Sequence, residues 1–205
     1  MGRPSDAREQ LLGAAKERIY ANSYEAVSVD EICAAAGVGK SSFYHFFPSK
    51  QDLVLAAIES QWEQFEELVL KPSFSDDVPP QEQLMRFFDL MWKRQQIRKQ
   101  TAGHVGGCPF GNLTLEMSTQ NEAIRARLVW VFQQWLGYFA RVLRQAKEQG
   151  MVAEELDIMV TAQALLAYVE GAMLLAKGNN DPAVIQTLRA GLLSVMQYQG
   201  ARQSG

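Results

Sequence analysis

Cysteine and histidine are scarce in this sequence, with two of each among 205 residues. Cys33 and Cys108 lie far apart along the chain and indicate no disulfide framework. His45 and His104 belong to different segments, and no group of cysteine and histidine has the spacing of a metal site. We therefore expect neither a structural metal nor a cofactor.

The sequence also lacks the segments that catalysis, secretion or membrane insertion would need. It has no Gly-rich phosphate loop and no nucleophile elbow, and neither histidine has an evident acid or nucleophile partner, so we expect no catalytic residues. Four charged residues, Arg3, Asp6, Arg8 and Glu9, lie within the first ten positions, where a signal peptide would have an apolar stretch. The most apolar segment, 164–176, is too short to span a bilayer and contains Glu170. These absences predict a cytoplasmic protein that has no membrane partner and is not an enzyme.

No run of alternating apolar residues predicts a β-strand, and the chain reads as helical throughout. A content of 47% hydrophobic and 21% charged residues, with a net charge of −3, is ordinary for a soluble protein. Loops are indicated at 71–80 and 101–111 by proline and glycine. Apolar residues at helical spacing predict helices at 28–36, 40–47, 49–70, 82–98, 121–149, 157–177 and 182–199. We expect an all-α fold.

The segment 28–47 contains two short helical patterns joined by a glycine turn. Ser28 and Glu31 have the spacing of a capping box, in which each side chain accepts a hydrogen bond from a backbone N–H at the start of a helix. Gly37 can take the left-handed conformation that ends a helix, and Gly39 can begin the next one. The two helices should therefore meet at a sharp angle, as in a helix-turn-helix.

The second of these helices, 40–47, has an apolar side and a polar side. Phe43, Phe46 and Phe47 can pack against the preceding helix. The outward side chains carry hydrogen-bonding groups suited to phosphates and base edges, and they are Lys40, Ser41, Ser42, Tyr44 and His45. A compact helical hairpin with no nucleic-acid role would show the same local pattern.

A wider resemblance favours nucleic-acid binding. Residues 8–21, 28–47 and 48–53 together resemble the DNA-binding domain of the tetracycline-repressor (TetR) family. The segment 43–50, Phe-Tyr-His-Phe-Phe-Pro-Ser-Lys, is especially specific for that family. The resemblance covers the N-terminal quarter of the chain and implies a helix-turn-helix domain at residues 1–52.

The same resemblance implies roles for individual residues. It places Tyr44 on the recognition helix and makes Lys50 a ligand of a backbone phosphate. Further contacts are expected from Ser28, Lys40, Ser41 and His45. The sequence departs from the family at Ser23, where Gly is usual, and at Gly39, where Ser is frequent.

The remaining residues, 53–205, are expected to form an effector-binding and dimerisation domain. The helices at 121–149 and 157–177 are too apolar for one small domain to cover fully, although a monomeric core is the alternative. A homodimer is favoured because two-fold symmetry sets two recognition helices about 34–36 Å apart, the length of one DNA turn. The expected nucleic-acid partner is therefore double-stranded DNA with a palindromic operator.

Aromatic and Met side chains concentrate between the two predicted parts of the chain. Such a group is more often core, but in the TetR family the same region holds a pocket for a small organic effector, and apolar pockets with few polar groups suit such ligands. The expected effector-binding residues are Trp62, Phe65, Phe88, Met91, Trp92, His104, Phe110, Asn112 and Met117.

The function expected from these patterns is a ligand-responsive transcriptional regulator, a repressor released from its operator by a small organic effector. One alternative is a thiol-based sensor of electrophiles or oxidants acting through Cys108, which precedes a predicted helix N-terminus and lies in a stretch resembling one TetR subgroup. Inert packing of Cys108 explains the same stretch. A further alternative is a helical adaptor that binds only protein.

Overall fold

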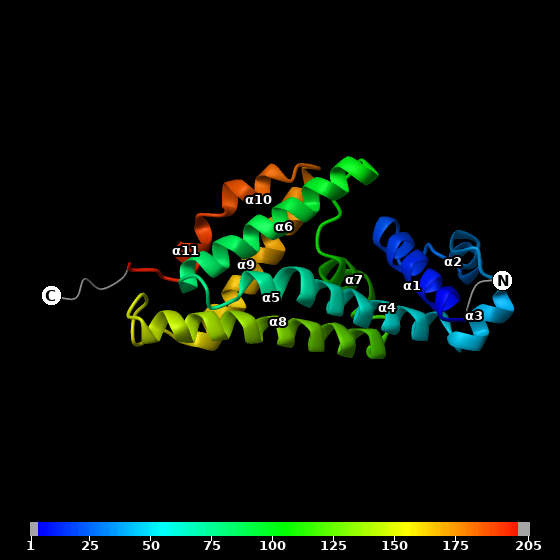
Figure 1. The fold of residues 1–205 in the computed structure, drawn as a ribbon, viewed down its shortest axis with the longest axis horizontal. Helices are drawn as coiled ribbons and strands as arrows, with labels where there is room; N and C mark the ends of the chain where they lie inside the picture. The colour runs from blue at the N-terminus through cyan, green and yellow to red at the C-terminus, as the bar shows by residue number, and fades with distance from the viewer. Residues whose placement is uncertain (1–3, 201–205) are drawn as a thin grey trace. The chain divides into compact units, whose positions relative to one another are not determined.

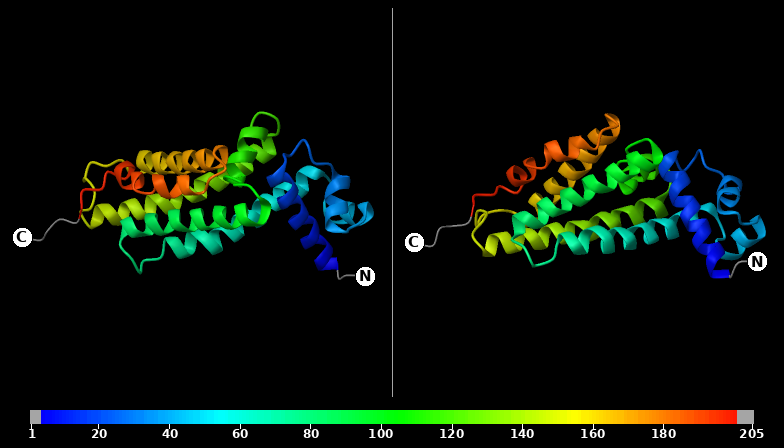
Figure 2. Two further views of the ribbon diagram at one scale, coloured as in Figure 1. Left: turned by 90° about the horizontal axis from the view of Figure 1, so that it is seen from above. Right: turned by 45° about the horizontal axis from the view of Figure 1, so that its top comes forward.

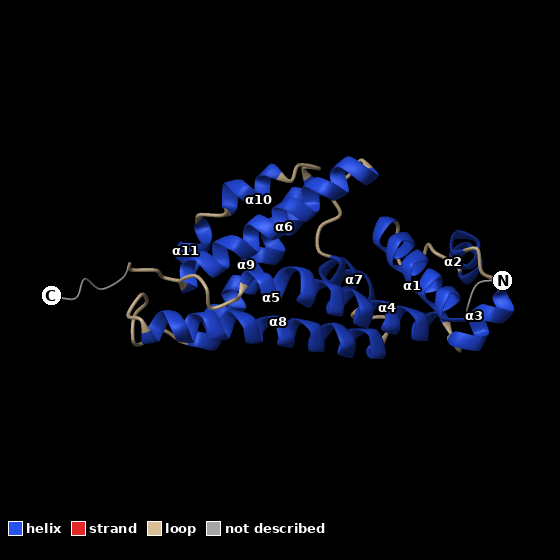
Figure 3. Ribbon diagram, in the orientation of Figure 1, coloured by secondary structure: helices blue, strands red, loops and turns tan. Residues whose placement is uncertain are grey.

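The computed structural model describes residues 4–200, and all regular structure in that range is helical (Figures 1 and 3). This confirms the expected all-α fold. The elements are α1 (Pro4–Ala21), α2 (Val29–Ala36), α3 (Lys40–Phe46), α4 (Lys50–Phe65), the π-helix η1 (Glu66–Leu70), α5 (Lys71–Ser73), α6 (Pro80–Ala102), α7 (Pro109–Met117), α8 (Glu122–Glu148), α9 (Ile158–Gly178), α10 (Ala183–Leu188) and α11 (Gly191–Val195).

Contacts group the chain into two compact units. Unit 1 comprises Met1–Gln64 and Pro109–Val131, and unit 2 comprises Phe65–Cys108 and Phe132–Gly205. Unit 1 therefore includes most of α4, all of α7 and the start of α8, in addition to the helix-turn-helix expected at residues 1–52.

The helix-turn-helix part of unit 1 has a small apolar core. Leu11 and Ala15 of α1, Ile32 of α2 and Phe43 of α3 are each 0% exposed and belong to one cluster. Helix α1 contacts both α2 and α3, as the two views of Figure 2 show. The sequence builds this core by placing apolar residues at helical spacing on all three helices, and α2 and α3, of 8 and 7 residues, are too short to be stable alone.

Unit 2 has an aromatic core. The ring of Trp135 packs edge-on against Phe65 and Phe87, with centroids 4.8 and 5.8 Å apart. Phe74 stacks on Phe87 at 5.4 Å, and Phe139 meets Phe87 edge-on at 5.7 Å. Edge-to-face and offset arrangements of this kind add to the stability gained from apolar burial.

The helix expected at 49–70 is α-helical only as far as Phe65. The turn Glu66–Leu70 is a π-helix, and α5 follows it without a loop. Pro72 lacks a backbone N–H, so the regular i to i−4 ladder cannot pass through this position. Local changes of helix type are usual at such places.

The helix expected at 182–199 is broken into α10 and α11, and Tyr168 of α9 provides the reason. Its hydroxyl donates to the carbonyl of Leu188 at 2.8 Å. The amide of Leu192 donates instead to Arg189, at 3.3 Å. A Cβ on Gly191 would stand 2.0 Å from the Tyr168 hydroxyl, so this close approach requires glycine. In Figure 1, α10 lies beside α6 and α9, both of which it contacts.

The apolar segment expected at 164–176 belongs to a longer helix. By length and composition alone, α9 (Ile158–Gly178) is the one helix among the described residues that could cross a membrane. This observation is weak by itself, since core helices of soluble proteins pass the same test. The helix expected at 157–177 is thus present, and it extends beyond its most apolar stretch at both ends.

Candidate nucleic-acid interface

The turn between α2 and α3 is built as the sequence predicts. The Ser28 hydroxyl accepts the Glu31 amide at 3.2 Å, and the Glu31 carboxylate accepts the Ser28 amide at 2.7 Å. Gly37 ends α2 with φ of 64°, in the left-handed region. Gly39 begins α3 in an extended conformation. The three residues 37–39 thus join the two helices, with a left-handed glycine at one end and an extended glycine at the other.

The side chains of α3 divide between the core and the solvent. Phe43 is 0% and Phe47 4% exposed, and Phe46 is half-buried against the same core. Tyr44 is 57% exposed, and its ring meets Phe43 edge-on at 5.0 Å. Lys40, Ser41 and His45 are exposed and Ser42 is half-buried. The α3 residues expected to contact DNA are therefore accessible to solvent, Ser42 in part, whereas Ser28 and Lys50 lie outside this helix.

Two of the expected contact residues are already engaged within the protein. The Lys40 ammonium lies 2.6 Å from the Asp30 carboxylate, and the hydrogen bond to Asp30 raises the pKa of Lys40. Ser28 uses its hydroxyl and its amide in the capping box with Glu31. A role of Ser28 in DNA binding would therefore have to coexist with its role as a helix cap.

Lys50, at the start of α4, is also engaged. Its ammonium donates to the Tyr24 carbonyl at 2.5 Å and lies 4.1 Å from the centre of the Tyr24 ring. An ammonium has three N–H donors, so this contact leaves donors for a phosphate. The Ser23 position adopts no left-handed conformation, and its hydroxyl accepts the Ala26 amide at 3.2 Å, so the departure from the family's glycine causes no strain there.

Comparison with known protein families identifies this arrangement. Residues 11–57 match the family described as bacterial regulatory proteins, tetR family, and residues 80–192 match the tetracyclin repressor-like C-terminal domain. The chain belongs to the TetR family of transcriptional regulators. TetR-family proteins are DNA-binding regulators and not enzymes, which confirms the expectation of no catalytic function. They are in general soluble and cytoplasmic, and they typically form dimers and respond to small molecules.

Individual TetR-family relatives are similar along most of the chain. The transcriptional regulator AcuR of Cereibacter sphaeroides is 35% identical over 171 residues, which are 83% of this chain and 76% of AcuR. The transcriptional repressor DhaR of a Mycobacterium species is 27% identical over 177 residues, 85% of each chain. A crystal structure of a regulatory protein TetR from Rhodobacter sphaeroides superposes with a TM-score of 0.82 at 31% identity, covering 94% of this chain and 98% of that one. These matches argue against the alternative of a helical adaptor that binds only protein.

The residues expected to bind an effector are divided between the two units. Trp62, Phe110, Asn112 and Met117 belong to unit 1, where the rings of Trp62 and Phe110 lie 6.4 Å apart. The members in unit 2 are Phe65, Phe88, Met91, Trp92 and His104. Within unit 2, Phe65 packs on Trp135, and Phe88 stacks on Tyr168 at 6.2 Å.

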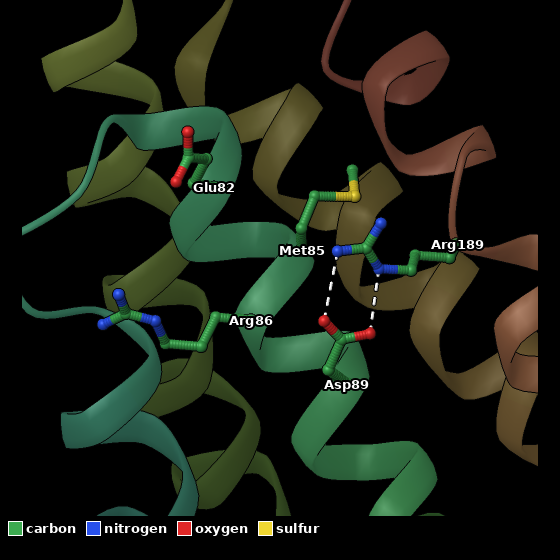
Figure 4. Close-up of a pocket in the computed structure, with 5 residues that line it drawn as sticks. All are labelled: Glu82, Met85, Arg86, Asp89 and Arg189. Atoms are coloured by element: carbon green, nitrogen blue, oxygen red, sulfur yellow. Dashed lines mark hydrogen bonds and ion pairs between the residues drawn. The ribbon is translucent and has the colours of Figure 1, made fainter.

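A pocket of about 450 Å³ lies elsewhere in unit 2 (Figure 4). Its lining residues are Glu82, Met85, Arg86, Asp89 and Arg189, none of which was expected to bind an effector. Figure 4 shows Arg189 facing Asp89, and the shortest separation in this ion pair is 2.9 Å. Arg86 is paired with Asp77. Four of the five lining residues are charged, so this pocket differs in chemistry from the apolar site that the sequence suggested.

Cys108 is buried in unit 2, at the end of a loop that is tightly held. The buried Gln95 side chain accepts the amides of Gly106 and Gly107 and donates to the Gly107 carbonyl, at 3.0 to 3.2 Å. The thiol of Cys108 donates to the carboxyl group of Glu170 on α9. Burial raises the pKa of Glu170, and the hydrogen bond from Cys108 opposes that shift. No sequence pattern indicates the Gln95 and Glu170 contacts, because each joins residues on different elements.

Proposed function

We propose that this TetR-family regulator is a homodimeric repressor that reads a palindromic operator through α3 and is released by a small organic effector. The observation that supports it most directly is the division of α3: Phe43 and Phe47 fix the helix in the core, while Tyr44 and its polar neighbours are exposed. Specific readout requires base-contacting side chains on a rigidly held helix. DhaR, one of the similar proteins, is named a repressor.

The dimer is proposed to form through one face of α9. Val160, Ala164, Ala167, Gly171 and Leu174 recur at intervals of four and three residues along this helix. Val160 is 61% and Leu174 59% exposed, and Ala164 and Ala167 are exposed as well. Alternating intervals of four and three form one stripe on a helix, and its small residues permit close approach of a second helix. This face explains the apolar character of α9 without a membrane.

The effector is proposed to bind at the aromatic core of unit 2. Trp135 is 0% exposed, and its indole N–H has no hydrogen-bond partner among the described residues. A buried donor without an acceptor costs about 1–3 kcal/mol. An effector with a carbonyl or carboxylate oxygen would supply the acceptor, and Phe65 and Phe88 would supply apolar contacts.

Release requires that the effector bind the DNA-free state more tightly than the DNA-bound state. A difference of about 1–3 kcal/mol is typical of such coupling. We propose that the effector repacks the aromatic core of unit 2 and so changes the spacing of the two recognition helices in the dimer.

The proposal is tested by selecting duplexes from a random library with the full-length protein. Sequencing of the retained DNA should give a palindrome whose half-sites are about one helical turn apart. Retention of no duplex above background would refute DNA-reading by this chain. A panel of small carbonyl compounds and carboxylates is then screened for release of the selected duplex, and Trp135→Phe should lose release while it keeps DNA binding.

A second candidate is thiol chemistry at Cys108, whose thiol lies beside the carboxyl group of Glu170 on α9. The burial of Cys108 at 4% exposure acts against it by limiting access. The parent and Cys108→Ser are treated with an alkylating reagent, and binding to the selected duplex is measured. Loss of binding in the parent alone would favour the sensor, whereas equal loss in both, or loss in neither, would leave the ligand pocket.

A further inference from the structure

A glutamate of α7 holds the loop that leads into the helix-turn-helix. One oxygen of Glu116 accepts the Tyr24 amide at 2.9 Å and the other accepts the Glu25 amide at 3.0 Å. Both partners lie in unit 1. Hydrogen bonds from backbone amides to a carboxylate are charge-assisted and stronger than neutral ones. These bonds connect Glu116, which lies in the C-terminal family match at 80–192, to Tyr24 and Glu25, which lie in the N-terminal match at 11–57.

Glu116 and Lys50 both bind the backbone of Tyr24. Glu116 binds the amide of Tyr24, while the Lys50 ammonium binds the carbonyl and faces the ring of the same residue. Burial raises the pKa of the Tyr24 phenol, and the charges of Glu25 and Glu116 add to this effect. Tyr24 therefore stands between an acid of α7 and the lysine expected to bind phosphate.

A second contact connects the same part of the chain to the neighbour of Lys50. The side-chain NH2 of Asn121 donates to the side-chain oxygen of Gln51 at 2.6 Å. The side-chain oxygen of Asn121 accepts the backbone amide of Ile124 at 3.0 Å, at the start of α8. The segment between α7 and α8 is thus bonded to Gln51, which follows Lys50, as well as to Tyr24. Two independent contacts make the position of Lys50 depend on this segment.

We propose that Glu116 is a positioning residue for DNA binding, which through Tyr24 holds the Lys50 ammonium in place to bind a backbone phosphate. This inference rests on the proposed DNA-reading function. Lys50 keeps its bond to the Tyr24 carbonyl and donates another N–H to the phosphate. A movement of α7 that separates Glu116 from the two amides frees the Tyr24 peptide. The Lys50 ammonium, which bonds to that peptide, is then no longer held in one position. Glu116 thereby gives the C-terminal part of the sequence a direct means of weakening DNA binding.

The test compares Glu116→Gln with Glu122→Gln, using the duplex selected by the parent protein. Both changes remove one negative charge from unit 1, which by itself should tighten DNA binding. Glu122 is a suitable control because its carboxylate pairs with Arg125 on the same helix. Glu116→Gln is expected to bind about three- to tenfold more weakly than the parent, the range usual for coupled neighbours. Glu122→Gln is expected to bind as tightly as the parent or slightly more tightly.

A double-mutant cycle with Lys50→Met separates positioning from general destabilisation. If Glu116 acts through Lys50, Glu116→Gln should not weaken binding further in the Lys50→Met background, where only the slight tightening from the lost negative charge should remain. Hydrogen exchange at the Tyr24 and Glu25 amides should be faster in Glu116→Gln and unchanged in Glu122→Gln. The inference is overturned if Glu116→Gln binds as tightly as Glu122→Gln, or if it weakens binding equally in both backgrounds. Failure of the parent to retain any duplex would instead refute the proposed function and the role of Lys50 with it.

Discussion

Lys40, the only lysine of the recognition helix, lies 2.6 Å from Asp30 of the preceding helix. Both side chains are more than half exposed, so the ion pair is screened by solvent and contributes little to folding stability. Its consequence lies in recognition instead. In the proposed mode of DNA binding, an acid that pairs with Lys40 competes with DNA phosphate for the same ammonium and lowers the positive charge of the surface that would face DNA.

Asp30→Asn is therefore expected to tighten binding to all duplexes by about two- to tenfold and to steepen its salt dependence, because Lys40 then pairs only with phosphate. Fluorescence anisotropy at several salt concentrations measures both quantities. Asp76→Asn, at an exposed acid of unit 2 paired with Arg141, is the matched control and should change neither. An equal effect of Asp30→Asn in a Lys40→Ala background would show that competition for Lys40 is not the cause.

The neighbours Phe43 and Tyr44 should respond to truncation in opposite ways. Tyr44→Ala is expected to weaken operator binding by about 1–3 kcal/mol, because a base or phosphate contact is lost. It should change the free energy of unfolding by less than about 0.5 kcal/mol, as is usual for an exposed residue. Phe43→Ala removes a fully buried ring and should cost about 3–5 kcal/mol of stability. Chemical denaturation of both variants measures the free energy of unfolding, and binding titration measures their affinity for the operator. Unchanged operator binding of Tyr44→Ala would contradict the proposed orientation of α3.

Features governed by neighbours in sequence were predictable. The capping box of Ser28 and Glu31 and the left-handed Gly37 depend on backbone geometry within a few residues, and the structure shows both. The burial of Phe43 follows from helical periodicity in the same way.

Features governed by contacts between distant residues were not predictable. Tyr168 breaks the last helix from 20 residues away, and Glu116 reaches Tyr24 across 92 residues. Composition and periodicity carry no information about such pairs. For the same reason no sequence pattern indicates that Glu116 bonds to the loop before α2.

The two glycines of the turn should differ sharply in their tolerance of serine. At Gly37, φ is 64°, so Gly37→Ser should destabilise the protein by about 1–2 kcal/mol. At Gly39 the backbone is extended, an added Cβ meets no atom within 4 Å, and α3 has no side-chain cap. Gly39→Ser should therefore stabilise by about 0.5 kcal/mol, through a new cap and a less flexible unfolded chain. Denaturant unfolding of the two variants compares them directly, and equal losses would contradict the assigned turn geometry.

The proposed dimer face is tested by charge insertion at Leu174. Leu174→Arg should convert the dimer to monomer, because it buries an arginine in an apolar interface. Ile97→Arg of α6 is a close control, since Ile97 and Leu174 are each 59% exposed and only Leu174 belongs to the α9 stripe. Sedimentation at several protein concentrations reports the oligomeric state. A dimeric Leu174→Arg variant, or a monomeric Ile97→Arg variant, would move the interface away from this face.

Glu170 should make stability depend on pH in the direction opposite to that of an exposed, paired acid. Burial raises its folded-state pKa above the ordinary value of 4.5. Its stabilising contribution is therefore complete below that ordinary value and is lost as pH rises through the raised one, because a buried charge then forms.

Replacement by a neutral amide removes this penalty while keeping an acceptor for Cys108. Glu170→Gln should thus melt higher than the parent at neutral pH, and the difference should shrink toward zero as the pH falls to about 4. For Glu122, the hydrogen bond from Arg125 lowers the pKa, so Glu122→Gln should show a small difference of the opposite sign. Thermal melts of the three proteins across this pH range provide the measurement. A Glu170→Gln variant that melts lower than the parent at neutral pH would mean that the Glu170 carboxylate stabilises the fold. That result would contradict the claim that ionisation of Glu170 beside Cys108 destabilises the folded state.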